Sequence, residues 1–111
     1  MESLRQQKVA SQIKKDVSDI FTKEASGVLG GAMVTVTVVR VSPDLGYAKI
    51  YLSVFPFEKS EQVLASVEDN AWMVRKALAT RVRNQLRIVP ELSFFLDDSL
   101  EYIENIENLL R

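Results

Sequence analysis

Five cationic side chains lie within thirteen residues in the second half of this 111-residue chain, and no acidic residue lies between them. They are Arg75, Lys76, Arg81, Arg83 and Arg87. Like charges at helical spacing repel one another unless an anion lies close by. Because lysine and arginine are the residues that most often contact phosphate oxygens in nucleic acids, the cluster predicts contact with RNA, with an affinity that falls as salt rises.

Each member of this cluster also has a purely structural interpretation. Arg75 could pair with an acid of the last predicted helix, and any of the five could simply be solvated. Three further cations are weaker candidates for RNA contact, namely Arg5 and Lys8 near the free end of the first helix and Lys49 on the outward side of a strand.

The residue types give little support to catalysis or metal binding. The chain has no histidine and no cysteine, so it lacks the commonest general base, every thiolate ligand and any disulfide. Asp97 and Asp98 form an acidic pair, but neighbours in a strand point to opposite sides and Asp98 is expected to begin a helix. We therefore expect no enzymatic activity, no cofactor, no metal and no small-molecule substrate.

The net charge of −1 hides a strong segregation. Residues 1–87 hold thirteen Lys or Arg against nine Asp or Glu, whereas residues 88–111 hold one against six. A surface binds according to its local field, so an acidic tail does not exclude an anionic partner. No stretch approaches the roughly 18 apolar residues of a membrane span, and the first residues are polar. We expect a cytoplasmic protein of one domain, residues 1–111.

Apolar spacing predicts the elements that carry these groups. A first helix is expected over 3–26, with an apolar stripe at every third or fourth residue, and glycines end it. Two strands, 34–41 and 47–55, form a hairpin. Its turn at 42–46 places Gly46 where a positive φ is needed. The buried side of the first strand switches between Val38 and Val39, through a bulge there or burial on both faces. In the second, Ala48, Ile50, Leu52 and Val54 point inward.

The second half of the chain is predicted to be mostly helical. Ser60 is a plausible N-cap for a second helix, and a kink or short connector is expected near Asn70. A helix then continues over the basic cluster to Pro90, followed by a strand at 92–96 and a last helix at 100–110. The order predicts an α+β fold with helices on one face of a three-stranded sheet.

Four aromatic residues admit two interpretations. Tyr51, Phe55 and Phe95 face outward from the sheet and could stack on bases, although packing by the last helix or by neighbouring side chains is preferred. Trp72 is expected to close the edge of the core, with stacking on RNA as the alternative.

Several segments together resemble the ribosome-binding factor A family. The most specific are the turn Ser42-Pro43-Asp44-Leu45 and the element Arg87-Ile88-Val89-Pro90-Glu91-Leu92; they occur with Arg5, the stripe of the first helix and the pair Val74-Arg75. The resemblance covers nearly the whole chain. One departure is that Asn70-Ala71-Trp72 stands where the family often has an Ala-x-Gly kink between its second and third helices.

The resemblance implies a type II KH-like RNA-binding domain with an added C-terminal helix. It further implies a non-catalytic factor that binds immature small (30S) ribosomal subunits and their 16S rRNA during late maturation and rRNA processing, with a role in growth in the cold. We expect it to be monomeric when free and to need no membrane. The alternative hypothesis is a protein–protein adaptor or homodimer whose basic helix meets an acidic partner.

Overall fold

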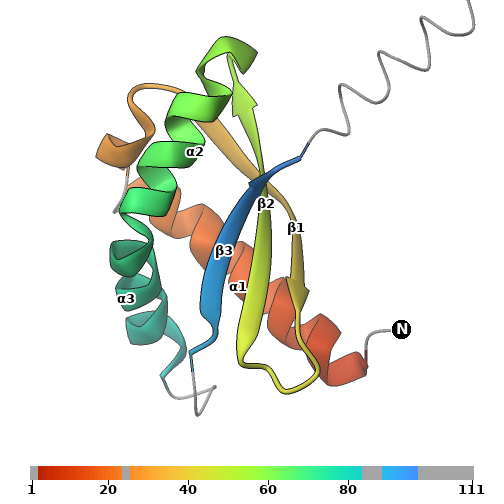
Figure 1. The fold of residues 1–111 in the computed structure, drawn as a ribbon. Helices are drawn as coiled ribbons and strands as arrows, with labels where there is room; N and C mark the ends of the chain where they lie inside the picture. Colours follow the sequence, from red (N-terminus) through yellow and green to blue (C-terminus); the bar gives the residue numbers. More distant parts are fainter. Residues whose placement is uncertain (1–2, 24–25, 84–88, 98–111) are drawn as a thin grey trace, which may run out of the picture.

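The computed structural model describes residues 3–23, 26–83 and 89–97. In chain order these residues form α1 (Leu4–Lys23), a 3-10 turn η1 (Ser26–Leu29), β1 (Met33–Val41), β2 (Tyr47–Phe55), a 3-10 turn η2 (Phe57–Lys59), α2 (Ser60–Asp69), α3 (Ala71–Val82) and β3 (Glu91–Leu96) (Figure 1). The predicted last helix at 100–110, its predicted capping residue Asp98 and the candidate Arg87 lie outside the described residues.

The three strands form one mixed sheet in the order β1-β2-β3. Strand β1 is antiparallel to β2, as the predicted hairpin requires, and β3 is parallel to β2. A parallel pair needs a long crossover connection, which α2 and α3 supply. In β2, Ala48, Ile50, Leu52 and Val54 are all buried, so the predicted inward side of that strand is confirmed.

The helices pack on one face of this sheet. Helix α1 crosses β1 and also contacts α3, while α2 contacts β2 and β3 (Figure 1). Phe21 of α1 meets Phe94 of β3 edge to face, with ring centroids 6.1 Å apart, a geometry that aromatic pairs prefer. The predicted α+β class is therefore confirmed, with one core between the sheet and the helical layer.

Helix α1 is shorter than predicted. Its start is fixed by a capping box, in which Ser3 Oγ accepts the Gln6 amide at 3.1 Å and Gln6 Oε1 accepts the Ser3 amide at 2.8 Å. Gln6 also donates to the Val41 carbonyl at 2.8 Å, which ties the helix to the end of β1. The helix runs to Lys23, and Ser26, the predicted last residue, instead begins the tighter turn η1, which contains Gly27.

Strand β1 contains the expected bulge, but one residue earlier than predicted. Val36 pairs with Leu52 and Val38 with Tyr51, so Thr37 is the extra residue. The Thr37 hydroxyl donates to the Tyr51 carbonyl at 3.3 Å. Val38 is therefore exposed and not inward as predicted, because the unpaired residue reverses the side on which later side chains lie.

The hairpin turn also differs from the prediction. The residue with positive φ is Leu45 (φ 61°), not Gly46. The cause is Asp44, whose carboxylate accepts a hydrogen bond from the Ser42 hydroxyl at 2.6 Å and another from the Gly46 amide at 3.0 Å. These two bonds fix the backbone on both sides of Leu45, and they hold the pKa of Asp44 below its ordinary value.

Asn70 separates α2 from α3, which confirms the predicted break. Its backbone (φ −111°, ψ 18°) leaves the helical region. Its amide donates to the Ser66 and Val67 carbonyls and its side chain to the Ser66 carbonyl at 2.8 Å. Its own carbonyl accepts hydrogen bonds from the amides of Met73 and Val74 in the first turn of α3. Ser60 was expected to cap α2 and does not: Lys59 occupies that position, because η2 already turns the chain there.

Candidate nucleic-acid interface

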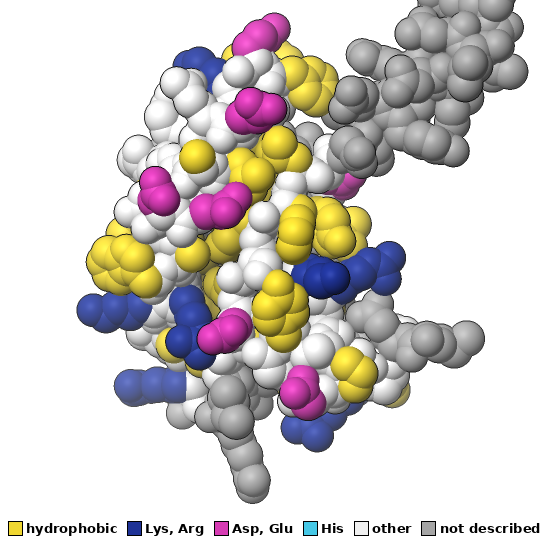
Figure 2. All heavy atoms as spheres, in the orientation of Figure 1, with side chains coloured by type: hydrophobic (Ala, Val, Ile, Leu, Met, Phe, Trp, Pro, Cys, Tyr) yellow, Lys and Arg dark blue, Asp and Glu magenta, His cyan; other side chains and the backbone are white. Residues whose placement is uncertain are grey.

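Helix α3 and the residue that follows it carry four of the five clustered cations on a scaffold with no acidic residue. Val74, Leu78 and Val82 are completely buried and fix one side of the helix against the core, as their spacing predicts. Figure 2 shows the cationic side chains gathered over α3 and, separately, over the outer face of the sheet, with acidic side chains over α2. The cations of α3 do not form one uniform group, however.

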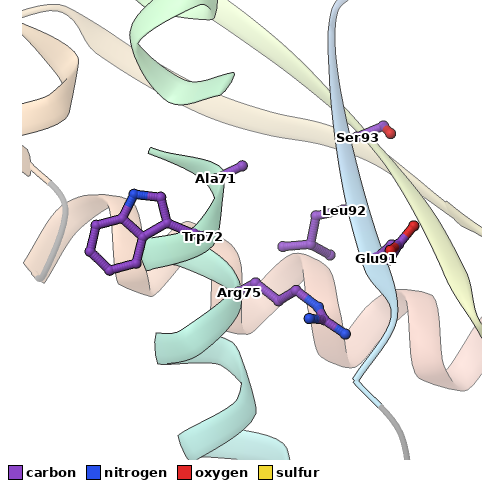
Figure 3. Close-up of a pocket in the computed structure, with 6 residues that line it drawn as sticks. All are labelled: Ala71, Trp72, Arg75, Glu91, Leu92 and Ser93. Carbon is purple, nitrogen blue, oxygen red and sulfur yellow. The ribbon is translucent and has the colours of Figure 1, made fainter. Parts of the chain in front are cut away.

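Arg75 is fixed to the strand β3. Its Nε donates to the Pro90 carbonyl at 3.2 Å and its Nη2 to the Val89 carbonyl at 2.9 Å. In Figure 3 the side chain extends across a shallow hollow of about 210 Å³ towards Glu91 and Leu92. Its acceptors are the two carbonyls just before β3, so the arginine holds the start of that strand against α3. The predicted alternative of a structural role is thus supported, but with carbonyl partners and not an acid of the last helix.

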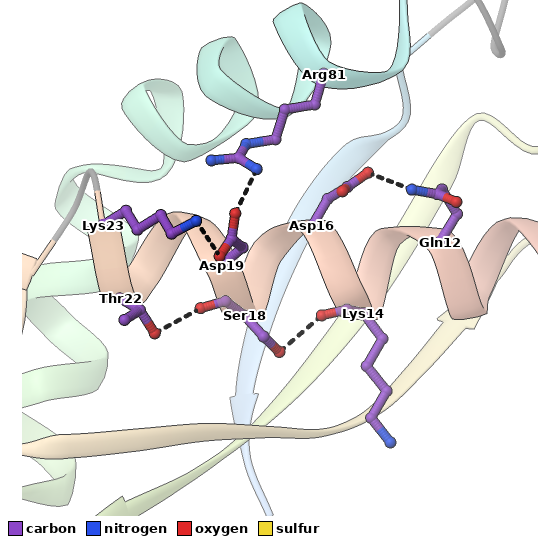
Figure 4. Close-up of polar contacts among 8 residues, drawn as sticks. All are labelled: Gln12, Lys14, Asp16, Ser18, Asp19, Thr22, Lys23 and Arg81. Carbon is purple, nitrogen blue, oxygen red and sulfur yellow. Dashed lines mark hydrogen bonds and ion pairs between the residues drawn. The ribbon is translucent and has the colours of Figure 1, made fainter.

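Arg81 is fixed to α1. Its Nη1 lies 2.7 Å from Asp19 Oδ2, and Lys23 lies 3.3 Å from the other oxygen of the same carboxylate (Figure 4). The hydrogen bond from Arg81 is the main reason that the pKa of Asp19 lies below its ordinary value; the charges of Lys23 and Arg81 contribute in the same direction, and burial opposes them. Arg81 therefore joins two helices, and its charge is partly neutralised.

Lys76 and Arg83 differ from these two. Both are exposed, and neither side chain makes a hydrogen bond or ion pair with any residue that the structure describes. Arg83 follows the last residue of α3 and keeps helical backbone angles (φ −57°, ψ −26°), so it continues the same helical surface. These two residues offer the α3 charge that is available to an anionic partner.

The other candidates lie on different elements. Arg5 and Lys8 are exposed in the first two turns of α1. Asp19, through which α1 contacts α3, lies about 16 Å beyond Lys8 and about 21 Å beyond Arg5 along that helix. Lys49 is exposed on the outer face of the sheet, opposite Arg40 in the register of β1 and β2. The structure thus does not bring Arg5, Lys8 or Lys49 together with Lys76 and Arg83.

The outward aromatic residues of the sheet also differ in whether they contact another side chain. Tyr51 and Phe95 are partners in the β2–β3 register and stack on each other with centroids 5.5 Å apart. Their predicted packing against a neighbouring side chain is therefore confirmed. Phe55 is exposed at the end of β2. The predicted packing of the last helix against these aromatic residues cannot be compared, because that helix lies outside the described residues.

Trp72 was expected at the edge of the core, and this prediction is wrong. Its side chain is 65% exposed at the start of α3. The helical spacing alone predicts that Trp72 is exposed, since it lies two residues before Val74 and thus on the side opposite the buried stripe. The tendency of tryptophan to be buried outweighed that signal in the prediction.

Across the described ranges, no helix is both long and apolar enough to cross a membrane, and no three acidic, histidine or cysteine side chains gather at a possible metal site. The order helix, strand, strand, helix, helix, strand, with helices on one face of a mixed sheet, defines a type II KH-like domain. Such a domain with an acid-free cationic helix belongs to the class of nucleic-acid-binding modules.

The comparisons with known proteins identify the family. Residues 5–110 match the family model described as ribosome-binding factor A. A ribosome-binding factor A from Cytophaga hutchinsonii is 44% identical over 110 residues, which cover 99% of this chain and 83% of that protein. The chain therefore belongs to the ribosome-binding factor A family, as its sequence motifs predicted.

Solved structures agree with this assignment. The crystal structure of ribosome-binding factor A from Thermus thermophilus superposes with a TM-score of 0.69 and 25% identity, covering 82% of this chain and 94% of that one. A homology model of the Thermus thermophilus factor, fitted into a cryo-EM map of a 30S–RbfA complex, gives a TM-score of 0.63 and 26% identity over 80% of this chain and 91% of that one.

Proposed function

We propose that this chain is a non-catalytic assembly factor that binds the RNA of the small ribosomal subunit during late maturation and rRNA processing. Its family and the 30S complex of the Thermus relative support this proposal. The observation that carries it is the acid-free surface of α3, on which Lys76 and Arg83 are exposed without a partner among the described residues. Phosphate is the ligand that such cations attract in RNA.

The proposed mechanism is differential binding. A factor that prefers one conformation of the rRNA shifts the population towards that conformation by no more than the difference between its two affinities. No cofactor or covalent step is needed. The whole chain would act as one monomeric domain in the cytoplasm, and it would leave the subunit once the favoured RNA conformation no longer exists.

The candidate residues take two different roles in this proposal. Lys76 and Arg83 contact phosphates directly, while Arg75 and Arg81 position α3 against β3 and α1. The remaining candidates, on other elements or outside the described residues, would extend the contact to a second RNA segment; they are Arg5, Lys8, Lys49 and Arg87.

The test is the salt dependence of binding to small subunits purified from the host. For the unmodified chain, log affinity should fall linearly with log salt, by about 0.7–0.9 for each phosphate contacted. The double variant Lys76→Gln/Arg83→Gln should reduce this slope by about twice that amount. The matched control is Lys14→Gln/Lys15→Gln, which removes the same charge from exposed positions of α1 and should keep most of the slope.

Two results would overturn the proposal. A nearly flat salt dependence of the unmodified chain would overturn it, since binding would then not depend on cations of the chain that contact phosphates. An equal loss of slope in the control would show that net charge matters and that α3 has no special role. The maturation stage is tested by sedimentation of the tagged chain in host lysate, where we expect it with free small subunits and not with translating ribosomes.

A further inference from the structure

Trp72 is the most conspicuous side chain that the proposed phosphate contacts leave unexplained. It is the only tryptophan of the chain, and its indole is 65% exposed. Exposing so large an apolar ring to water is unfavourable, and tryptophan is highly buried in most proteins. Figure 3 shows the indole beside the first turn of α3, where Trp72 is one of the residues that line the shallow hollow, while Arg75 extends across it towards the strand.

Trp72 lies on the same side of the helix as the two exposed cations. Lys76 follows four residues later and Arg83 eleven residues later, which places them about 40° and 20° around the helix from Trp72. The three side chains thus form one stripe along the exposed side of α3, about 16 Å long from the indole to Arg83. Because Arg75 and Arg81 are bound to other elements, this stripe contains an aromatic plane followed by two available positive charges.

The side chains around Trp72 favour nucleic acid over an apolar protein surface as its partner. The core of a protein interface is depleted of lysine and of acidic residues. The other large apolar residues that are exposed in the described part of the chain all lie outside α3; they are Leu4, Met33, Val38, Phe55, Phe57 and Phe95. One turn after Trp72 lie Arg75 and Lys76, whereas the acids Glu68 and Asp69 lie before it at the end of α2. The indole thus lies at the beginning of the cationic surface, and an aromatic ring next to cations is an arrangement that binds unpaired bases and their phosphates.

We propose that Trp72 stacks on an unpaired nucleobase of the RNA, while Lys76 and Arg83 contact phosphates of the same strand. This inference rests on the proposed function and adds to it the kind of RNA recognised: a single-stranded segment or an extruded base, because bases within a duplex do not expose their faces. The stacking itself is tolerant of sequence, since every base has a π face.

The experiment uses the fluorescence of Trp72, which reports on this site alone because the chain has no other tryptophan. The full chain is titrated with small-subunit rRNA, with single-stranded oligoadenylate and with a blunt RNA duplex of the same length. The oligoadenylate and the rRNA, which has unpaired segments, should quench the fluorescence, and the duplex should not. Trp72→Ala should weaken binding of oligoadenylate by about 5- to 150-fold, and Trp72→Phe should recover most of that loss.

Two controls make the result specific. Phe57→Ala removes another exposed aromatic residue, next to the opposite end of α2, and should leave the affinity unchanged. The salt slope separates stacking from charge: Trp72→Ala should keep the slope of the unmodified chain, whereas Lys76→Gln/Arg83→Gln should reduce it. Because the indole is exposed, we expect all Trp72 variants to fold, which thermal unfolding verifies.

The outcomes separate this inference from the function on which it rests. Unchanged affinity of Trp72→Ala with a steep salt slope would overturn stacking and leave the RNA-binding function intact. If Trp72→Ala loses affinity for whole subunits while neither naked rRNA nor oligoadenylate quenches the unmodified chain, Trp72 contacts a ribosomal protein and the inference is overturned. If the unmodified chain binds neither subunits nor RNA, the proposed function itself fails.

Discussion

Helices α2 and α3 follow one another in the chain and both bury a valine-containing stripe against the sheet, but their exposed sides carry opposite charge. Helix α2 has Glu61, Glu68 and Asp69 and no cation; α3 has Arg75, Lys76 and Arg81 and no acid. Figure 2 shows the two charges on neighbouring parts of one layer. Burial thus determines where a helix lies, and the exposed residues, which the fold does not constrain, determine what it can bind.

The break at Asn70 allows this change of charge within one layer. Asp69 lies directly before the first residues of α3, where the helix dipole favours a negative charge, and Arg81 lies in the last turn, where it favours a positive one. The acids at the end of α2 have no such benefit from their own helix. The charge distribution is therefore favourable for α3 and neutral or unfavourable for the end of α2.

The largest effect is expected from removing core contacts of α3. Leu78 is completely buried, whereas Leu64 of α2 is only partly buried. Leu78→Ala should lower the free energy of unfolding by about 2–5 kcal/mol, since it removes apolar contacts and leaves a cavity. Leu64→Ala should cost clearly less. Urea unfolding followed by circular dichroism measures both, and equal costs would contradict the view that α3 is the more deeply anchored helix.

The elements of the described fold could be predicted from the sequence because burial imposes a period on it. The alternation of β2 identified all four inward residues, and the poor helix propensity of Asn70 located the break. The errors arose where one local interaction decides the geometry. The extra residue Thr37 moved the bulge, and the carboxylate of Asp44 moved the positive φ from Gly46 to Leu45.

The sequence could show that the candidate site is a group of cations, but not which of these cations are bound to other parts of the fold. At about 100° per residue, Lys76 and Arg83 project opposite the buried stripe of Val74, Leu78 and Val82, and both are exposed. This spacing could not show that Arg75 binds the Val89 and Pro90 carbonyls or that Arg81 pairs with Asp19, because these partners come from distant parts of the chain. Exposure of Trp72 followed from the same spacing, although residue type argued against it.

A smaller effect is expected at the break itself. Asn70→Ala removes the hydrogen bond from the side chain to the Ser66 carbonyl at the end of α2, and should lower the free energy of unfolding by about 0.5–1.5 kcal/mol. Alanine also favours continued helix more than asparagine does. Thermal unfolding measures the loss. Glu68→Ala, at an exposed position two residues earlier, is the control; if it costs as much, the side-chain bond of Asn70 does not hold the end of α2.

The smallest effect concerns Arg81, which contributes to the charge of α3 but is bound to α1. Asp19 has a pKa below its ordinary value of 3.8, chiefly because Arg81 donates a hydrogen bond to it. The carboxylate therefore contributes stability above that ordinary value and loses the contribution as pH falls through the lower pKa of the folded chain. Arg81→Met should raise the pKa of Asp19 and so reduce this acid-dependent loss, as NMR titration of the carboxyl carbons would show. Asp44 is the internal control, since its lowered pKa depends on Ser42 and Gly46 and should not move. An unchanged pKa of Asp19 would mean that Lys23 alone holds the carboxylate, and that the contact of Arg81 does not join α3 to α1.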